Sequence, residues 1–472
     1  MAPRGRRTES RAGNSIPASI FRAYDIRGIV EEQLTEDGVK QISRGIGSEA
    51  LANGIDTLLV GFDGRLSSPS LSRALTAGLL STGCKVVNLG MVPTPLLYYA
   101  SHTSGFESGV MLTASHSPAN YNGLKVVFKQ TCLAANQIQK IRQRVEQGQL
   151  RNGVGSYSEL DIQSQYIEAI CSSVSLGRKL KLVVDCGNAV PGLVAPELFR
   201  ALGCEVEPLF CDIDGNFPNH HPDPTVADNL ASLSARVVAS QADLGIAFDG
   251  DGDRLGIVTN LGEVVDADKI LMLLVKHIAP KYPAAPIIFD VKCSSNLARV
   301  ITAMGAIPVM HRSGHSFMKQ KMQETGAPLG GEFSAHIFIK DRWFGFDDGL
   351  YAAARVLEIL SHLRHSAHEE FASFPSSPNT PEIKLPVPEA DRFELMQRII
   401  DKADFPGAKL VLLDGLRVEY SDGWGLVRAS NTSAALLLRF EADTLPRLQA
   451  IQTSFKALIH SADRSLELNF SL

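Results

Sequence analysis

Short apolar runs alternate with amphipathic segments along most of this chain. Thr57–Gly61 is nearly all apolar and predicts a buried strand. The segment after it places leucines four residues apart on one helical face, at Leu71, Leu75 and Leu79. Ser68 followed by Pro69 predicts the cap and first residue of this helix. The same strand–helix order returns near residues 181 and 269, so we expect α/β layers with mostly parallel strands.

The remaining pattern divides the chain into units. Further strands are predicted at residues 85–89, 109–113, 181–185, 244–248, 255–258, 287–291, 411–413 and 435–440. Further helices are predicted at residues 197–202, 269–278, 316–324 and 348–360. Ser373–Pro381 contains three prolines and predicts a linker before a smaller α+β domain. We place domains at residues 16–160, 161–263, 264–375 and 376–472, with a disordered leader at 1–15.

Composition excludes several classes of protein. With 44% hydrophobic and 21% charged residues over 472 positions, the chain is typical of a soluble globular protein of several domains. Its net charge of −5 gives no overall attraction to nucleic acid or anionic membranes, and no apolar run approaches a membrane span. The first fifteen residues are polar and Arg-rich, which is unlike a signal peptide; a nucleic-acid arm is the alternative to a disordered leader. Seven dispersed cysteines predict reduced thiols in the cytoplasm.

One loop between two apolar runs has an unusual density of carboxylates. Asp249, Asp251 and Asp253 alternate with glycine and are followed by Arg254. Such a cluster is costly without a cation, and an oxygen-only ligand set favours Mg²⁺ or Ca²⁺ over Zn²⁺. An EF-hand loop requires Gly at its sixth position and Glu at its twelfth, where this loop has Arg254 and Asn260. We therefore expect a different hard-cation site, with a solvated acidic turn as the alternative.

A second polar loop follows the predicted strand at 109–113. It contains Ser115 beside His116, with Pro118 two residues later. Neighbouring side chains point apart and no G-x-S-x-G motif surrounds the serine, so a conventional serine hydrolase is disfavoured. A phosphorylated Ser115 would need a cation and basic neighbours, and the aspartate loop could hold that cation. A Ser/Thr turn ahead of Pro118 is the alternative.

Three further segments carry groups that suit a sugar phosphate. Glu332, Ser334 and His336 alternate along the chain, so in an extended segment they would face one side and meet a row of hydroxyls. Arg428 stands shortly before hydroxyl and amide side chains that suit a phosphate, namely Ser430, Asn431 and Thr432. Phe21–Gly28 mixes aromatic and basic residues. The alternative is a polar strand face for Glu332–His336, a plain turn for the segment at Arg428, and a surface loop for Phe21–Gly28.

Together and in this order, these segments resemble the α-D-phosphohexomutase family, in particular its bacterial phosphomannomutase/phosphoglucomutase branch. The resemblance extends from about Ile20 to the C-terminus. It implies three similar mixed α/β domains and a smaller C-terminal α+β domain around a central cleft. It also implies an isomerase that moves a phosphoryl group reversibly between hexose 6-phosphate and hexose 1-phosphate. The substrates would be mannose or glucose phosphates, and the reaction would pass through a phosphoserine and a hexose 1,6-bisphosphate.

The resemblance also assigns roles to individual residues. Ser115 would be the phosphorylated serine and, with Asp249, Asp251 and Asp253, would hold one Mg²⁺. The other catalytic residues would be Arg27, Arg254 beside the reacting phosphoryl group, and the acid–base candidates His116 and Lys125. Substrate would be bound by Tyr24, Lys292, His315, Glu332, Ser334, His336, Arg428, Ser430, Asn431 and Thr432. The partners would be small hexose phosphates, not nucleic acid or a membrane, and the chain would act as a monomer.

Two positions and one condition qualify these expectations. Ser117 stands where the family usually has Asn, and its shorter side chain reaches less far. Asn431 counts against a mutase for amino-sugar phosphates, in whose phosphate loop Gly is usual. Lys125 could accept a proton only if cationic neighbours lowered its pKa. An amino-sugar mutase and a non-catalytic sugar-phosphate-binding homologue remain the alternatives, and the choice between glucose and mannose stays open.

Overall fold

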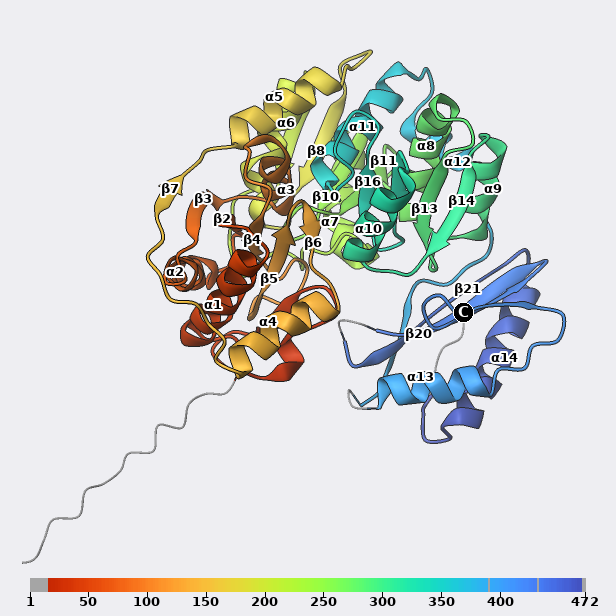
Figure 1. Cartoon of the computed structure of the whole chain (residues 1–472). Helices are drawn as coiled ribbons and strands as arrows, with labels where there is room; N and C mark the ends of the chain where they lie inside the picture. The colour runs from red at the N-terminus through yellow and green to blue at the C-terminus, as the bar shows by residue number, and fades with distance from the viewer. Residues whose placement is uncertain (1–15, 389–390, 431–432, 469–472) are drawn as a thin grey trace, which may run out of the picture.

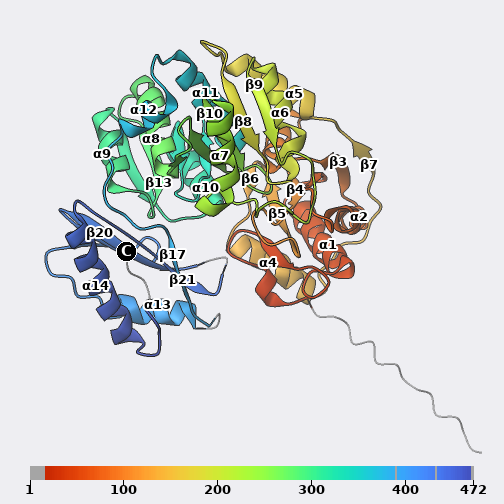
Figure 2. The ribbon, with the colours of Figure 1, turned by 180° about the vertical axis from the view of Figure 1, so that it is seen from behind.

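The computed structural model describes residues 16–388, 391–430 and 433–468. Four domains follow one another around an arc, from the red first domain to the blue fourth (Figure 1). The opposite view shows the fourth domain beside the third and facing α4 of the first (Figure 2). The four-domain α/β fold predicted from the sequence is therefore confirmed, whereas the predicted leader at 1–15 lies outside the described residues.

The first domain is a seven-stranded sheet with helices on its faces. Its strands are β1 (Ile26–Ile29), β2 (Thr57–Phe62), β3 (Lys85–Met91), β4 (Gly109–Leu112), β5 (Tyr121–Phe128), β6 (Thr131–Cys132) and β7 (Tyr157–Glu159). Its helices are α1 (Glu36–Ala52), α2 (Ser68–Leu80), α3 (Thr94–Thr103) and α4 (Asn136–Glu146). The strand order is β1-β5-β4-β2-β3-β7, and β6 pairs with β5.

Helix α2 lies where the sequence predicts it, but it starts differently. Leu71, Leu75 and Leu79 are all buried, as expected for one face of an amphipathic helix. Ser68 is the first helical residue rather than the cap, and its hydroxyl donates to the Asp63 carboxylate at 2.5 Å. The predicted capping role of Ser68 is therefore wrong, because its side chain is used to build the loop after β2.

The second and third domains repeat a smaller version of this layout. The second contains α5 (Gln163–Ser173), α6 (Ala195–Ala201), α7 (Ala231–Ser240), β8 (Lys181–Asp185), β9 (Glu205–Leu209), β10 (Leu244–Phe248), β11 (Leu255–Thr259) and β12 (Val264–Val265). The third contains α8 (Ala267–Ile278), α9 (Ser295–Ala303), α10 (His315–Thr325), α11 (Gly349–His362), α12 (Ala367–Ala372), β13 (Pro286–Asp290), β14 (Ile307–His311), β15 (Leu329–Gly331) and β16 (Ile337–Ile339). Their strand orders are β12-β11-β10-β8-β9 and β14-β13-β15-β16.

The fourth domain is an antiparallel sheet with two helices. It contains β17 (Ile383–Pro386), β18 (Lys409–Val411), β19 (Leu416–Tyr420), β20 (Gly423–Ala429), β21 (Ala435–Ala442), α13 (Arg392–Asp401) and α14 (Leu445–Ala462). Its strand order is β17-β21-β20-β19-β18. Short 3₁₀ helices elsewhere span Ala18–Ile20, Val190–Leu193, Ala227–Leu230 and Ala279–Lys281. The Pro-rich segment predicted as a linker lies between α12 and β17.

One extended apolar cluster joins the first three domains. It includes Leu96 of α3, Phe248 of β10 and Phe289 of β13, all of them buried. The fourth domain has a core of its own and meets the third through a small cluster of Val291, Trp424 and Leu426. Because burial of apolar surface is the main stabilising term, the first three domains form the more firmly joined part of the molecule.

The same hairpin recurs in each of the first three sheets. A strand with a parallel neighbour is followed directly by an antiparallel partner, in the pairs β4/β5, β10/β11 and β15/β16. Short connections are possible between antiparallel strands, whereas a parallel crossover needs a longer one. The loops of these hairpins hold the serine, the aspartates and the Glu332–His336 segment, so the predicted chemistry lies on equivalent loops of three repeated units.

Candidate active site

The serine loop and the aspartate loop meet. Ser115, after β4, donates a 2.6 Å hydrogen bond from its hydroxyl to the carboxylate of Asp249, after β10. The hydroxyl also lies 3.2 Å from Nδ1 of His116. Ser115 and Asp249 are both buried. Two loops predicted independently from the sequence thus form one site between the first two domains.

Arg65, which sequence reasoning did not single out, holds the serine loop in place. Its guanidinium donates to the main-chain carbonyls of Ser115, Ser117 and Pro118 at 2.6–2.7 Å, and to that of Tyr121 at 3.1 Å. The fork geometry of arginine suits several carbonyls at once. Ser115 itself has a left-handed backbone with φ of 52°, a conformation that disfavours most side chains and needs such support.

The aspartate loop is closed by its own first carboxylate. Asp249 Oδ1 accepts from the amides of Gly252 and Arg254 at 3.0 and 3.2 Å. Asp251 Oδ2 accepts from the Thr94 hydroxyl of the first domain at 2.5 Å. Lys125 Nζ lies 2.6 Å from both Asp251 and Asp253. The three carboxylates are therefore fixed by contacts that cross the domain boundary.

Lys125 could act as a proton-accepting base only if cationic neighbours lowered its pKa, and its surroundings do the opposite. Burial alone would lower its pKa, but the carboxylates of Asp251 and Asp253 outweigh burial and raise the pKa above its usual value. Its close neighbours are anionic rather than cationic, contrary to that condition. The side chain stays charged in this arrangement and balances the aspartates.

The aspartate residues fit a hard cation. Oxygens of Asp249, Asp251 and Asp253 lie within 4.8 Å of one another. Asp251 Oδ1 and Asp253 Oδ1 are buried without a hydrogen-bond partner among the described residues. Burial and the two neighbouring aspartates raise the pKa of Asp249 well above its usual value. Buried carboxylate oxygens that lack a hydrogen-bond partner are what a bound Mg²⁺ would satisfy.

His116 is an uncharged group beside the serine hydroxyl. Burial, together with the charges of Arg254 and Arg27, lowers the pKa of His116 well below its usual value. Its main-chain carbonyl contacts the His221 ring, which fixes the loop. A neutral imidazole next to Ser115 Oγ has a lone pair or a proton to exchange with it.

The Glu332–His336 segment differs from the extended strand assumed in the sequence analysis. It is a tight turn in which Ala335 has φ of 71°, so the three polar side chains do not share a strand face. Glu332 instead accepts from the Gly314 amide at 2.5 Å and from the Ser334 hydroxyl at 2.9 Å. The Nε2 atom of His336 instead lies 3.2 Å from Arg254 Nε. The extended conformation expected for Glu332–His336 is therefore wrong, although all three polar residues lie on the loop between β15 and β16.

Aromatic and cationic side chains complete the surroundings. The ring of Tyr24 packs edge-on against His315 of the third domain, with centroids 5.1 Å apart. Arg27 is buried and pairs with Asp25 at 2.5 Å. The contact of Tyr24 with His315 and the hydrogen bond from Arg27 to the Ser117 hydroxyl place the N-terminal Phe21–Gly28 segment against the third domain and the serine loop.

Two cationic side chains near the fourth domain, one of them from the third domain, are paired with carboxylates. Arg428 pairs with Asp414 at 2.9 Å, and Lys292 of the third domain lies 3.3 Å from Glu382. Ser430 accepts from the Ser433 amide at 3.1 Å. The other two residues of the predicted phosphate loop, Asn431 and Thr432, lie outside the described residues.

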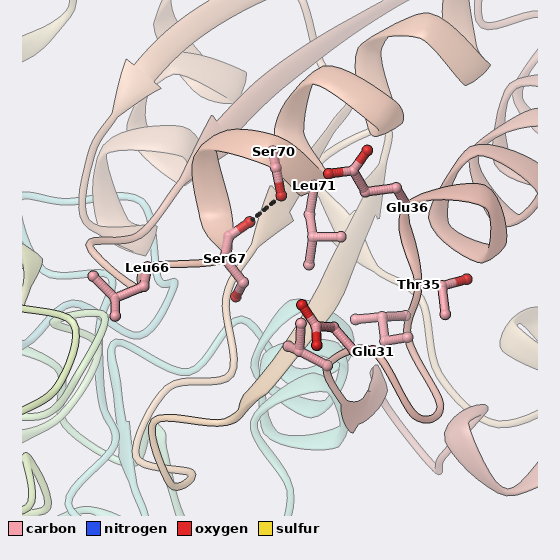
Figure 3. Close-up of a pocket in the computed structure, with 9 residues that line it drawn as sticks. Glu31, Thr35, Glu36, Leu66, Ser67, Ser70 and Leu71 are labelled. Atoms are coloured by element: carbon pink, nitrogen blue, oxygen red, sulfur yellow. Dashed lines mark hydrogen bonds between the residues drawn. The ribbon is translucent and has the colours of Figure 1, made fainter.

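A separate hollow of about 410 Å³ opens on the first domain, near the starts of α1 and α2 (Figure 3). Its lining combines Leu66 and Leu71 with the carboxylates of Glu31 and Glu36. None of the predicted site residues line it, and its two carboxylates would repel a phosphate. The hollow is therefore not where we expect a sugar phosphate to bind.

Comparison with known proteins gives a consistent result over nearly the whole chain. The four models of the phosphoglucomutase/phosphomannomutase domains match residues 18–152 (alpha/beta/alpha domain I), 164–262 (domain II), 266–377 (domain III) and 382–458 (C-terminal domain). A phosphomannomutase/phosphoglucomutase of Pseudomonas aeruginosa is 51% identical over 456 residues, covering 97% of this chain and 98% of that protein. A phosphoglucomutase of Neisseria gonorrhoeae is 46% identical, covering 95% of this chain and 98% of that protein.

Solved structures agree with the sequence relatives. The crystal structure of a phosphoglucomutase/phosphomannomutase family protein from Burkholderia thailandensis superposes with a TM-score of 0.91 at 46% identity, covering 96% of this chain and 100% of that chain. Among the residues that the structure describes, no helix is long and apolar enough to cross a membrane.

Proposed function

This chain belongs to the phosphoglucomutase/phosphomannomutase family, the bacterial branch of the α-D-phosphohexomutases, and we propose that it interconverts hexose 6-phosphates and hexose 1-phosphates. The enzyme is an isomerase that moves a phosphoryl group within its substrate. Glucose and mannose phosphates are the proposed substrates, since relatives carry both names. Small sugar phosphates would thus be the partners, and one site would serve both half-reactions.

The observation that carries this proposal is the 2.6 Å hydrogen bond from Ser115 to Asp249. It places a hydroxyl beside three buried carboxylates whose free oxygens suit Mg²⁺. We propose that Ser115 is phosphorylated in the active enzyme. Mg²⁺ would be held by the three aspartates and a phosphate oxygen, and it would supply positive charge to the phosphoryl group.

The charged side chains around Ser115 support phosphoryl transfer. The transition state spreads negative charge over the phosphoryl oxygens, so fixed cations nearby stabilise it. Arg254 has Nε 3.8 Å from Asp249 Oδ2, the oxygen that Ser115 contacts, and is the proposed cation there. Burial would lower the pKa of Arg254, but Asp223 and Asp249 outweigh it, so the guanidinium stays charged.

The proposed transfer moves one phosphoryl group and one proton. The bond between phosphorus and Ser115 Oγ breaks, and a bond forms between phosphorus and the free sugar hydroxyl. The sugar hydroxyl loses its proton and Ser115 Oγ gains one, and His116, the uncharged imidazole beside Oγ, is the proposed carrier of that proton, because Lys125 is already protonated. The resulting hexose 1,6-bisphosphate turns over in the site, and its other phosphate returns to Ser115.

The fourth domain and the third-domain loop would hold the part of the sugar phosphate that does not react. Arg428, Ser430, Asn431 and Thr432 are the proposed ligands of the distal phosphate, with Lys292 nearby. Glu332, Ser334, His336 and His315 would bind sugar hydroxyls beside Tyr24. A site that reads a phosphate and several hydroxyls can accept the bisphosphate in either orientation.

Intact-mass measurement tests the central step. The purified protein should carry a fraction heavier by one phosphate, and glucose 6-phosphate or mannose 6-phosphate should discharge it. Ser115→Ala should lose both the added mass and nearly all turnover. Ser158→Ala, at an exposed serine of β7, is the matched control and should keep both. A phosphate retained on Ser115→Ala, or near-normal turnover by that variant, would remove Ser115 from the mechanism.

Parallel assays separate the proposed substrates from the amino-sugar alternative. A relative from Pyrococcus horikoshii named probable phosphoglucosamine mutase is 31% identical, covering 94% of this chain and 99% of that protein. Glucose, mannose and glucosamine 1-phosphates should therefore be compared side by side. We expect the first two to be turned over at least tenfold faster than the third. A preference for the glucosamine phosphate would replace the substrate proposal while leaving the phosphoserine mechanism in place.

We further propose that the enzyme acts as a monomer in the cytoplasm. The proposed site takes side chains from all four domains of one chain, so a second copy would not be needed to complete it. All seven cysteines lie within the described residues and are free thiols, as expected in a reducing compartment. Light scattering should give a mass near 51.0 kDa, and a mass of twice that value would contradict the monomer.

A further inference from the structure

We propose that Asp347 is a positioning residue of this site, which acts through His336 on Arg254. The inference rests on the proposed function, in which Arg254 lies beside the reacting phosphoryl group. Asp347 stands between β16 and α11, directly before the helix that the sequence pattern predicts at residues 348–360. It is fully buried, with 0% of its surface exposed. A buried carboxylate at this place needs an explanation, because unpaired it would be costly.

The two oxygens of Asp347 face different partners. Oδ1 accepts from Lys319 Nζ at 2.7 Å. Oδ2 lies 3.1 Å from Nδ1 of His336 and 3.6 Å from Nδ1 of His315. The two imidazole rings stack with centroids 5.7 Å apart. The Asp347 carboxylate therefore lies near the Nδ1 atoms of both His336 and His315, the two histidines proposed to bind the substrate.

The backbone fixes Asp347 against the aspartate loop. The amide of Gly349 donates to the carbonyl of Gly252 at 3.1 Å. A side chain at Gly349 would bring its Cβ to 2.6 Å from the carbonyl oxygen of Arg254, so only glycine allows this approach. Asp347 is consequently held at a set distance from the residues on which we propose it acts.

The hydrogen bond between Arg254 and His336 determines where the imidazole proton sits. Arg254 Nε is always a donor, and it lies 3.2 Å from His336 Nε2, which must therefore accept. In a neutral ring the proton is then on Nδ1, between Asp347 at 3.1 Å and Asp253 at 3.4 Å. Neither contact has the geometry of a full hydrogen bond, so the two carboxylates attract a shared N–H. Asp347 thus favours the tautomer that lets His336 hold Arg254.

The same three side chains are close enough to hold a metal ion, but the hydrogen bonding argues against it. Asp253, His336 and Asp347 place one ligand atom each within 4.8 Å of one another. A metal on His336 Nδ1 would move the ring proton to Nε2, where it would face the N–H of Arg254. Lys319 already neutralises Asp347. The arrangement is therefore better suited to orienting a histidine than to binding a second cation.

Loss of the Asp347 charge should release this control. The ring proton of His336 would no longer be drawn to Nδ1, and an Nε2–H tautomer would push Arg254 away from its present position. Arg254 is proposed to stabilise the transition state of phosphoryl transfer. The loss of Asp347 should therefore lower kcat rather than raise KM. Outer carboxylates that orient a functional histidine typically contribute roughly ten- to hundredfold, and we expect a loss of kcat in that range.

The test compares Asp347→Asn with the adjacent control Asp348→Asn. Asp348 is also buried, but it accepts from Tyr166 and Trp343, away from the site. Asp347→Asn should lower kcat at least tenfold with KM within about twofold of the parent. Combined with His336→Gln, it should cause little further loss, because both changes disable the same relay. Any loss caused by Asp348→Asn should multiply with that of His336→Gln.

A spectroscopic readout keeps the inference testable apart from catalysis. Imidazole ¹⁵N shifts of labelled protein should report Nδ1–H at His336 in the parent and a shift toward Nε2–H in Asp347→Asn. If Asp347→Asn does not fold, Asp347→Asn with Lys319→Met removes the ion pair as a unit and replaces it in both measurements. An unchanged tautomer together with kcat within twofold of the parent would overturn the proposal. Absence of mutase activity in the parent would refute the proposed function, whereas the tautomer would still decide the role of Asp347.

Discussion

Arg27 donates a 2.8 Å hydrogen bond to the hydroxyl of Ser117. Ser117 is the residue at which the serine loop departs from its usual pattern, and this contact gives the shorter side chain a structural role. Arg27 is buried and also pairs with Asp25, so the bond ties β1 to the loop that carries Ser115. The departure therefore does not leave the loop unsupported.

Removal of the Ser117 hydroxyl should weaken this tie. Hydrogen bonds to charged groups contribute about 1.5–3 kcal/mol, so we expect Ser117→Ala to lower kcat/KM about tenfold or more. Ser117→Asn keeps an acceptor for Arg27 and should stay within about threefold of the parent. Steady-state assays of the two variants, with Ser158→Ala as the exposed control, check this. Equal activity of Ser117→Ala and the parent would show that the Arg27 contact does not support the loop.

Asp348 should make stability depend on pH in a defined direction. Burial raises its pKa to about 7, although hydrogen bonds from Tyr351, Tyr166 and Trp343 oppose the rise. Between about pH 4 and 7 the folded carboxyl keeps its proton while the unfolded one has lost it, since the unfolded pKa is near 3.9. The contribution of Asp348 to stability is thus complete below about pH 4 and is lost as pH rises through about 7.

Thermal unfolding of Asp348→Asn and the parent between pH 5 and 8 checks this contribution. The amide cannot ionise, so the Tm of the parent relative to the variant should fall across that interval and level off above pH 7. Other groups titrate in both proteins and cancel in the difference. A Tm difference that is constant with pH would mean that Asp348 is ionised throughout this range.

Mg²⁺ should stabilise the folded protein through the aspartate loop. Binding of a ligand to the folded state at one hundred times its Kd adds about 2.7 kcal/mol, so Tm should rise by several degrees and fall back with chelator. Asp253→Asn should abolish most of this rise. Asp243→Asn, at a partly exposed aspartate paired with Arg178, should retain it. An equal Mg²⁺-dependent rise in Asp253→Asn would place the ion elsewhere.

The site residues that could be predicted from the sequence are those whose neighbours in the sequence already indicate their chemistry. The aspartate loop stands out because three carboxylates lie between two fully buried strands, and the serine loop because of its place after β4. Arg65 holds carbonyls that lie 50 or more residues away in the sequence. Asp347 contacts His336, which lies 11 residues before it. The roles of these two residues therefore cannot be recognised from the spacing of nearby residues. Asp63-Gly64-Arg65 after β2 was the available signal for the first, and the paired Asp347-Asp348 before α11 for the second.

The pairing of strands was also beyond the local pattern. Buried strands are apolar runs whether their neighbours are parallel or antiparallel, so the mostly parallel sheets expected from the sequence did not include the antiparallel pairs β4/β5, β10/β11 and β15/β16. The turn at Glu332–His336 was mistaken for an extended segment because alternation describes residue types and not backbone angles. Ala335 takes its left-handed conformation while its neighbour Leu255 donates to its carbonyl at 3.1 Å. Such tertiary contacts decide conformations that the sequence alone leaves open.

Arg428 should act in substrate binding rather than in the chemical step. Its side chain is buried and points to Asp414, and the pKa of Arg428 is raised because that carboxylate outweighs the effect of burial. A guanidinium fork binds a phosphate through two parallel hydrogen bonds, which a lysine cannot reproduce. We expect Arg428→Lys to raise KM for both hexose 1-phosphates about tenfold, with kcat changed less than threefold. Ser115→Ala should show the opposite division, and an unchanged KM in Arg428→Lys would mean that the distal phosphate binds away from the fourth domain.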